Sequence, residues 1–139
     1  MRRLIGLLAL LGLLALTTRA FTAEEASSVP EIPVKDMVTM VDLGAGKCIP
    51  CKLMAPIIKN LQEEYKGKAA IVFIDVWKNP EQEKKFNIHT IPTQIFYDED
   101  GKEIYRHEGF FAKDGILAVL KKAGVAVVES TEPSDVGHN

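Results

Sequence analysis

The sequence predicts an α/β protein in which helices cover a small mixed sheet, forming an α/β sandwich. Three observations favour this class. Apolar runs of strand length alternate with stretches of helical periodicity, in the order β–α–β–α–β–β–α. The run at residues 70–76 is typical of a central strand covered on both faces. A turn signal at residues 98–101 joins the last two strands, which predicts an antiparallel hairpin.

The first half of the domain is expected to form a strand and then a long helix. Residues 38–43 are rich in β-branched and apolar types, and the Gly-Ala-Gly at residues 44–46 ends this strand. The helix is expected to start near Cys48 and to stop at residues 66–68. Pro56 lies inside it and should kink it, because proline lacks an N–H and crowds the preceding turn. Apolar residues recur along the helix at helical spacing: Met54, Ile57, Ile58, Leu61 and Tyr65.

The second half is expected to add two helices and three strands. Asn79 and Pro80 should provide a cap and a first-turn proline for a short polar helix that ends near Phe86. A last helix is expected at residues 113–122, with Gly124 as its C-terminal stop. The strands are expected at residues 70–76, 93–97 and 102–108.

Composition excludes several classes of protein. The 139 residues suffice for one domain of ordinary size. The hydrophobic share of 47% and the charged share of 26% exclude a wholly disordered chain. Two cysteines cannot build a multi-disulfide scaffold. The formal net charge of -2 provides no electrostatic reason to expect a nucleic-acid partner.

The N-terminal segment has the features of a secretory signal peptide. Two arginines precede the uncharged run at residues 4–16, and small residues follow at Ala20 and Ala23. The run is shorter than the roughly 20 apolar residues that span a bilayer, and a retained short membrane anchor is the alternative. No cysteine lies near this junction, which excludes a lipid-modified cysteine anchor.

This interpretation divides the chain into four segments. After the signal peptide, a polar stretch with two prolines is expected to be a linker, and a polar, unpatterned C-terminal stretch is expected to be a flexible tail. The chain is expected to be exported, to the periplasm of a bacterium, where disulfides can form. The predicted segments are a signal peptide at 1–23, a linker at 24–33, the folded domain at 34–128 and the tail at 129–139.

The motif with the clearest chemistry is Cys48-Ile49-Pro50-Cys51, at the start of the long helix. The first thiol would sit where free N–H groups and the helix dipole favour an anion, so its pKa should be lowered, and Lys47 beside it could lower it further. Cys51, one turn into the helix, should be more buried and should resolve a mixed disulfide. A purely structural disulfide and half of a zinc site are the alternatives; the candidate zinc ligands besides the cysteines are His89, His107 and His138.

Two further features stand out beside the motif. Asp42 lies within an apolar strand, so it is either a solvated strand end or a buried carboxyl with a raised pKa that could exchange a proton with the dithiol. Pro92 directly precedes a predicted strand, either as an ordinary trans turn proline or with a cis peptide bond beside the active loop. In the second case, Ile91 would offer its backbone to an extended substrate peptide.

Together these residues resemble the thioredoxin family, from about Val38 to Gly124. The stretch VDLGAGKCIPCKLMAPII aligns without gaps to the family's redox region. Asp42 falls on the family's buried aspartate, Pro56 on its helix-kinking proline, Pro92 on its cis-proline and Gly109 on a glycine beside the substrate groove. The resemblance implies a thioredoxin fold, a three-layer sandwich. It also implies catalysis by Cys48, Cys51 and Asp42, and substrate binding by Ile49, Pro50, Ile91, Pro92 and Gly109.

The sequence also departs from the family pattern. Gly44 and Lys47 stand where family members commonly have aromatic residues. Phe73 stands where a lysine often pairs with the buried aspartate, so Asp42 would lack that cation. Ile49 replaces the glycine of the common CGPC motif. The two residues between the cysteines help to set the reduction potential, and therefore the direction of electron flow.

We therefore expect an exported thiol–disulfide oxidoreductase that reduces protein disulfides, with no organic cofactor or metal because the dithiol carries the electrons. The expected partners are protein disulfide substrates and a membrane-bound electron donor, and the chain is expected to be a monomer. A disulfide oxidase or isomerase on the same fold, and a non-catalytic binding module, are the alternatives. His89 is expected to face solvent, and Trp77 is expected to contribute to packing.

Overall fold

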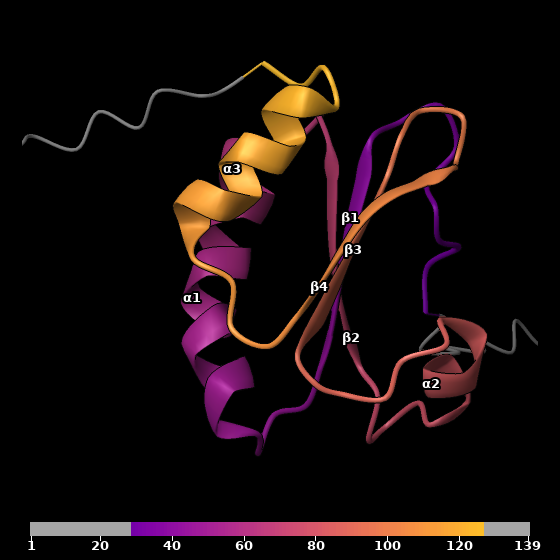
Figure 1. The fold of residues 1–139 in the computed structure, drawn as a ribbon, viewed down its shortest axis with the longest axis vertical. Helices are drawn as coiled ribbons and strands as arrows, with labels where there is room; N and C mark the ends of the chain where they lie inside the picture. The colour runs from indigo at the N-terminus through magenta and orange to yellow at the C-terminus, as the bar shows by residue number, and fades with distance from the viewer. Residues whose placement is uncertain (1–28, 127–139) are drawn as a thin grey trace, which may run out of the picture.

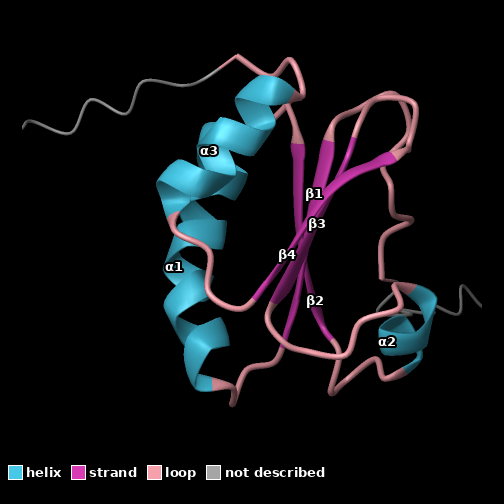
Figure 2. Cartoon of the chain, viewed as in Figure 1, coloured by secondary structure: helices cyan, strands magenta, loops and turns pink. Residues whose placement is uncertain are grey.

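The computed structural model describes residues 29–126, which form a four-stranded sheet between two layers of helices (Figure 1). Helices α1 and α3 cover one face of the sheet, and the short helix α2 lies on the other (Figure 2). The predicted three-layer α/β sandwich is confirmed. The elements in chain order are β1 (Thr39–Gly44), α1 (Ile49–Glu64), β2 (Ala70–Asp75), α2 (Glu81–Lys85), β3 (Thr93–Tyr97), β4 (Glu103–Glu108) and α3 (Lys113–Lys122).

The sheet is mixed, with the strand order β2-β1-β3-β4. Strand β1 runs parallel to β2 and antiparallel to β3, and β3 and β4 form the predicted antiparallel hairpin. The parallel pair is joined by α1, as a parallel connection requires a crossover element. Strand β1, which leads into the Cys48 motif, therefore has a neighbour on each side and is buried along its whole length.

Two hydrophobic clusters stabilise the three layers. The first lies between the sheet and helices α1 and α3, and it includes Met54, Leu61 and Leu120. The second lies on the opposite face, where Phe86 and Ile88, which follow α2, pack with Leu43 and Ile95. Because apolar side chains alternate between the two faces of β1 and β3, these two central strands exclude water on both faces.

The structure corrects the prediction for β2. This strand lies at an edge of the described sheet, not at its centre. Ile71 and Ile74 pack into opposite clusters, but Phe73 is 42% exposed. An apolar run predicts burial of a strand, but only the packing of its neighbours determines which residues are covered.

The start of α2 also differs from the prediction. Pro80, rather than Asn79, is the N-cap residue, and it makes no side-chain capping bond. The Asn79 amide instead donates to the Asp75 backbone carbonyl at 2.9 Å. By contrast, α3 has the predicted bounds, and Gly124 follows it with a φ of +89°, a backbone conformation that glycine tolerates best.

The packed region begins before the predicted boundary at residue 34. Ile32 is buried and belongs to the cluster on the α2 side of the sheet. The predicted signal peptide, the first half of the predicted linker (residues 24–28) and the predicted tail lie outside the described residues, as do residues 127 and 128 of the predicted domain. Among residues 29–126, no helix is long and apolar enough to cross a membrane.

Candidate active site

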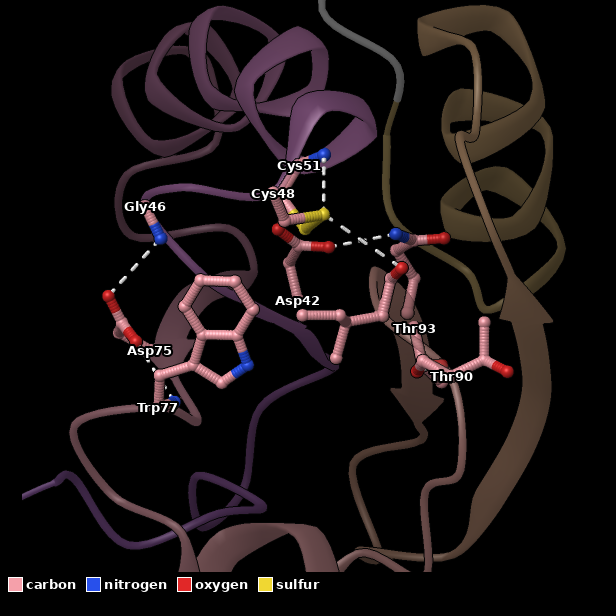
Figure 3. The surroundings of a disulfide bond; sticks show 10 residues. Asp42, Gly46, Cys48, Cys51, Asp75, Trp77, Thr90 and Thr93 are labelled. Carbon is pink, nitrogen blue, oxygen red and sulfur yellow. Dashed lines mark hydrogen bonds between the residues drawn. A yellow bond between two sulfur atoms is a disulfide. The ribbon is translucent and has the colours of Figure 1, made fainter.

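The two cysteines lie at the N-terminus of α1 and form a disulfide, with their Cα atoms 5.2 Å apart (Figure 3). Cys48 is the N-cap residue and is half-buried, whereas Cys51 lies in the first turn and is only 4% exposed. The prediction that Cys51 is the more buried of the pair is confirmed. Client molecules can therefore reach Cys48 more readily than Cys51.

The start of α1 favours negative charge at Cys48. The Cys51 backbone N–H donates to Cys48 Sγ at 3.3 Å, and the first turn of the helix contains no acidic residue. In the reduced protein, this N–H and the helix dipole would both stabilise a thiolate at Cys48. Lys47, next to it in sequence, is exposed.

Asp42 lies in the middle of β1 and is 1% exposed, which confirms the buried-carboxyl interpretation. The Gln94 side-chain amide donates to Asp42 Oδ1 at 2.8 Å. Burial raises the pKa of Asp42 from the ordinary 3.8 to about 6, although the hydrogen bond from Gln94 acts in the opposite direction. Phe73 pairs with Asp42 across the sheet, so no cation occupies that position.

The loop before β3 brings a second group of predicted residues to the disulfide. The Ile91–Pro92 peptide bond is cis, as one of the two interpretations predicted, and the Ile91 carbonyl oxygen lies 4.0 Å from Cys48 Sγ. Gly109, with a φ of +91°, donates its N–H to the Pro92 carbonyl at 2.7 Å. Ile91, Pro92 and Gly109 are thus assembled beside Cys48, and Ile49 lies 75% exposed at the start of the helix.

Asp75 is a site residue that the sequence analysis missed. Its carboxylate accepts hydrogen bonds from the N–H groups of Gly46 at 3.3 Å, Trp77 at 3.0 Å and Lys78 at 3.2 Å. It thereby ties the loop that precedes Cys48 to the turn that follows β2 (Figure 3). An acid followed by polar residues after a strand is a turn signal, but the sequence does not indicate a bond to Gly46.

Trp77 does not have the packing role that was expected for it. The residue is 57% exposed, and it lies among the residues that surround the disulfide (Figure 3). Trp77 lies in the turn that follows β2, and β2 is an edge strand of the described sheet. Gln94 was also missed, because an isolated polar residue in a strand does not reveal its partner.

The described residues do not gather the ligands that a zinc site would need. Within residues 29–126, no cluster of three or more His, Cys, Asp or Glu side chains could hold a metal ion. His89 is exposed, as expected, and His107 Nε2 lies 3.1 Å from the Phe110 carbonyl oxygen. His138 lies outside the described residues.

A disulfide between an accessible and a covered cysteine, at the edge of an α/β sandwich, can exchange electrons with the disulfides of other molecules. Fold and site together define the chain as a thiol–disulfide oxidoreductase. A family model described as thioredoxin matches residues 18–122, and the chain belongs to the thioredoxin family. Members of this family act on protein disulfides and normally need no cofactor.

Individual relatives agree with this assignment. A thioredoxin of Staphylococcus aureus is 38% identical over 89 residues, which cover 64% of this chain and 85% of that protein. A thioredoxin of Staphylococcus saprophyticus is 37% identical over the same shares. Among solved structures, chloroplastic thioredoxin z has a TM-score of 0.58 and 30% identity, covering 64% of this chain and 80% of its own. Fasciola hepatica thioredoxin has a TM-score of 0.58 and 28% identity, and the match covers 64% of this chain and 83% of that one.

Proposed function

We propose that this chain is an exported reductase of protein disulfides, with Cys48 as the attacking thiol and Cys51 as the resolving thiol. The observation that carries the proposal is the difference in exposure between the two cysteines, with Cys48 at the N-terminus of α1 and Cys51 beneath it. Only the accessible thiol can meet a sulfur atom in a folded client.

The reaction proceeds in two exchanges. The Cys48 thiolate attacks one sulfur of the client disulfide, which forms a mixed disulfide and releases the other client sulfur as a thiolate. Cys51 then passes its proton to Asp42, and its sulfur attacks Cys48 Sγ. The second client thiolate leaves, the Cys48–Cys51 disulfide forms, and two electrons have moved from the dithiol to the client.

The surface around Cys48 suits an extended peptide with apolar side chains. Ile91 presents backbone groups beside the disulfide, and Pro92 and Gly109 support that loop. The exposed apolar side chains nearby are Ile49 and, after Gly109, Phe110. Pro50 is also exposed and adds apolar surface. Apolar side chains that flank the client disulfide would be removed from water on this surface.

A reductase outside the cytoplasm needs a source of electrons, and we propose that a membrane-bound donor reduces the Cys48–Cys51 disulfide. The basic start and apolar run at residues 1–16 support export to a bacterial periplasm. Cell fractionation, with sequencing of the N-terminus of the isolated protein, tests export and cleavage. Light scattering tests the proposed monomer.

Cysteine substitutions test the chemistry. We expect Cys48→Ser to abolish reduction of insulin disulfides, because the attacking thiol is lost. We expect Cys51→Ser to retain the first exchange and to accumulate a mixed disulfide through Cys48, visible as an added mass that dithiothreitol removes. Full insulin reduction by the Cys48→Ser variant would refute the assignment.

The direction of electron flow is tested by the reduction potential of the Cys48–Cys51 pair, measured by equilibration in glutathione or dithiothreitol buffers. We expect a value near about -270 mV, in the range of reducing thioredoxins. A value near about -120 mV, typical of strong disulfide donors, would make the chain an oxidase instead.

A further inference from the structure

Four residues that pair across the sheet form a row through the site. Asp42 of β1 pairs with Phe73 of β2 on one side and with Gln94 of β3 on the other. Gln94 in turn pairs with His107 of β4. The neighbour of Asp42 on β2 has no hydrogen-bonding group in its side chain, so only the neighbour on β3 can satisfy the buried carboxyl from within this row.

Gln94 is an unusual residue for its position. It is fully buried in β3, and the next two residues of that strand are the core residues Ile95 and Phe96. A buried amide without partners is destabilising. Its Nε2 group donates to Asp42 Oδ1, while its Oε1 atom has no partner among the described residues. Within residues 29–126, the one hydrogen bond that this side-chain amide makes is therefore directed at the site.

The same bond distinguishes the two oxygens of the carboxyl. Oδ1 is held by Gln94, whereas Oδ2 is buried and has no hydrogen-bond partner within residues 29–126. The Asp42 carboxyl lies beside the Cys48–Cys51 disulfide in Figure 3. A buried, unpaired carboxylate oxygen readily accepts a proton, because protonation removes an unsolvated charge.

We propose that Gln94 is a positioning residue, whose amide holds Asp42 Oδ1 and thereby leaves Oδ2 free to accept the Cys51 proton during the second exchange. The proposal rests on the proposed function, since it concerns the same reaction. The S–H bond of Cys51 breaks, its proton moves to Oδ2, and its sulfur forms the bond to Cys48 Sγ as the client thiolate leaves.

The groups around Asp42 allow Gln94 to set its proton affinity. Cys51 from α1, Phe73 from β2 and Gln94 from β3 lie around the carboxyl, and His107 follows one strand further on. In the described part of the chain, no cation forms an ion pair with Asp42. The Gln94 bond favours the ionised carboxyl and opposes the effect of burial on its pKa. Its removal leaves burial to act alone.

The test is the titration of Asp42 in the oxidised full-length chain, in which the cysteines do not titrate. Carboxyl ¹³C NMR follows wild type and Gln94→Leu, which removes the donor at similar size. We expect the Asp42 midpoint of the variant to move up by about one pH unit. Gln82→Leu is the matched control, because Gln82 is also a buried glutamine but lies in α2, away from the disulfide. It should leave the midpoint unchanged.

The second measurement is insulin reduction as a function of pH. We expect the acidic limb of the Gln94→Leu profile to move upward together with the Asp42 midpoint, with rates restored at higher pH. Gln94→Met serves as a second variant without the donor if the leucine variant does not fold.

An unchanged Asp42 midpoint in the folded variant overturns the proposal, and so does a moved midpoint with an unmoved pH–rate profile. Loss of insulin reduction in wild type would instead overturn the proposed function, while the NMR titration would still decide whether Gln94 controls Asp42.

Discussion

Asp42 is subject to two opposing effects, and burial is the stronger. Desolvation disfavours its charged form, the Gln94 amide favours it, and the resulting pKa is about 6. The carboxyl is therefore mostly ionised at neutral pH although it is almost inaccessible to water. Such a group can accept a proton near neutral pH, and its charge lowers the stability of the fold.

The cost of that charge can be measured with Asp42→Asn. Because the folded-state pKa is raised, protonation favours the folded state, and wild type loses stability as pH rises from about 4 to above 6. The difference between 3.8 and about 6 corresponds to about 3 kcal/mol. We expect Asp42→Asn to be more stable than wild type at pH 7 by an amount of this order, and the advantage to disappear near pH 4. Urea unfolding of both proteins at pH 7 and at pH 4 checks this. The same difference in unfolding free energy at both pH values would contradict it.

At the scale of elements, one carboxylate connects two loops at the end of the sheet. Asp75, the last residue of β2, binds the turn that follows it and also Gly46 in the loop between β1 and α1. The loop that precedes Cys48 is therefore anchored twice. It continues from β1, and it is hydrogen-bonded to Asp75 of the neighbouring strand β2. Loops fixed in this way keep a reactive group in place.

Substitution of Asp75 tests this connection. We expect Asp75→Ala to lower the free energy of unfolding by about 1 kcal/mol, because three partly exposed N–H groups lose their acceptor. Insulin reduction should slow as the Cys48 loop loosens. Asp75→Asn retains one acceptor oxygen and should have the smaller effect on both quantities. If the alanine variant matched wild type in thermal melting and in activity, the connection would have no functional importance.

At the scale of the whole molecule, the site and the core share one sheet. Strands β1 and β3 place Asp42 and Gln94 on the face that α1 covers, and the same strands contribute Leu43 and Ile95 to the cluster on the other face. The catalytic geometry is therefore expected to be lost together with the packing of both layers, in one cooperative transition.

Leu61→Ala tests this cooperativity. Leu61 is fully buried between α1 and the sheet, and its truncation should cost about 3 kcal/mol. Far-UV circular dichroism reports the helices, and the single tryptophan, Trp77, reports the surroundings of the site. We expect both signals to shift to the same lower urea midpoint. Separate midpoints would mean that the site unfolds independently of the core.

Most of the fold followed from local patterns. The periodicity of Met54, Ile58 and Leu61 predicts α1 because a helix buries one stripe of residues, and the structure confirms its position. The bounds of α3 followed in the same way, and Gly124 ends it as predicted. The position of β2 at the sheet edge could not be predicted, since strand order depends on pairing between distant segments.

For the site, the sequence by itself determined the dithiol and its place at a helix N-terminus. The motif and its helix are local, because residues a few positions apart are brought together by the geometry of one helix. The placement of Pro92 beside Cys48 is a contact between distant segments, and the structure was needed to show it. The tertiary structure alone decided that Gln94 holds Asp42, that Asp75 ties down the loop before Cys48 and that Trp77 is exposed. Asp42 and Gln94 are 52 positions apart. Their contact depends on the register of two strands, and that register is set by the packing of the whole sheet.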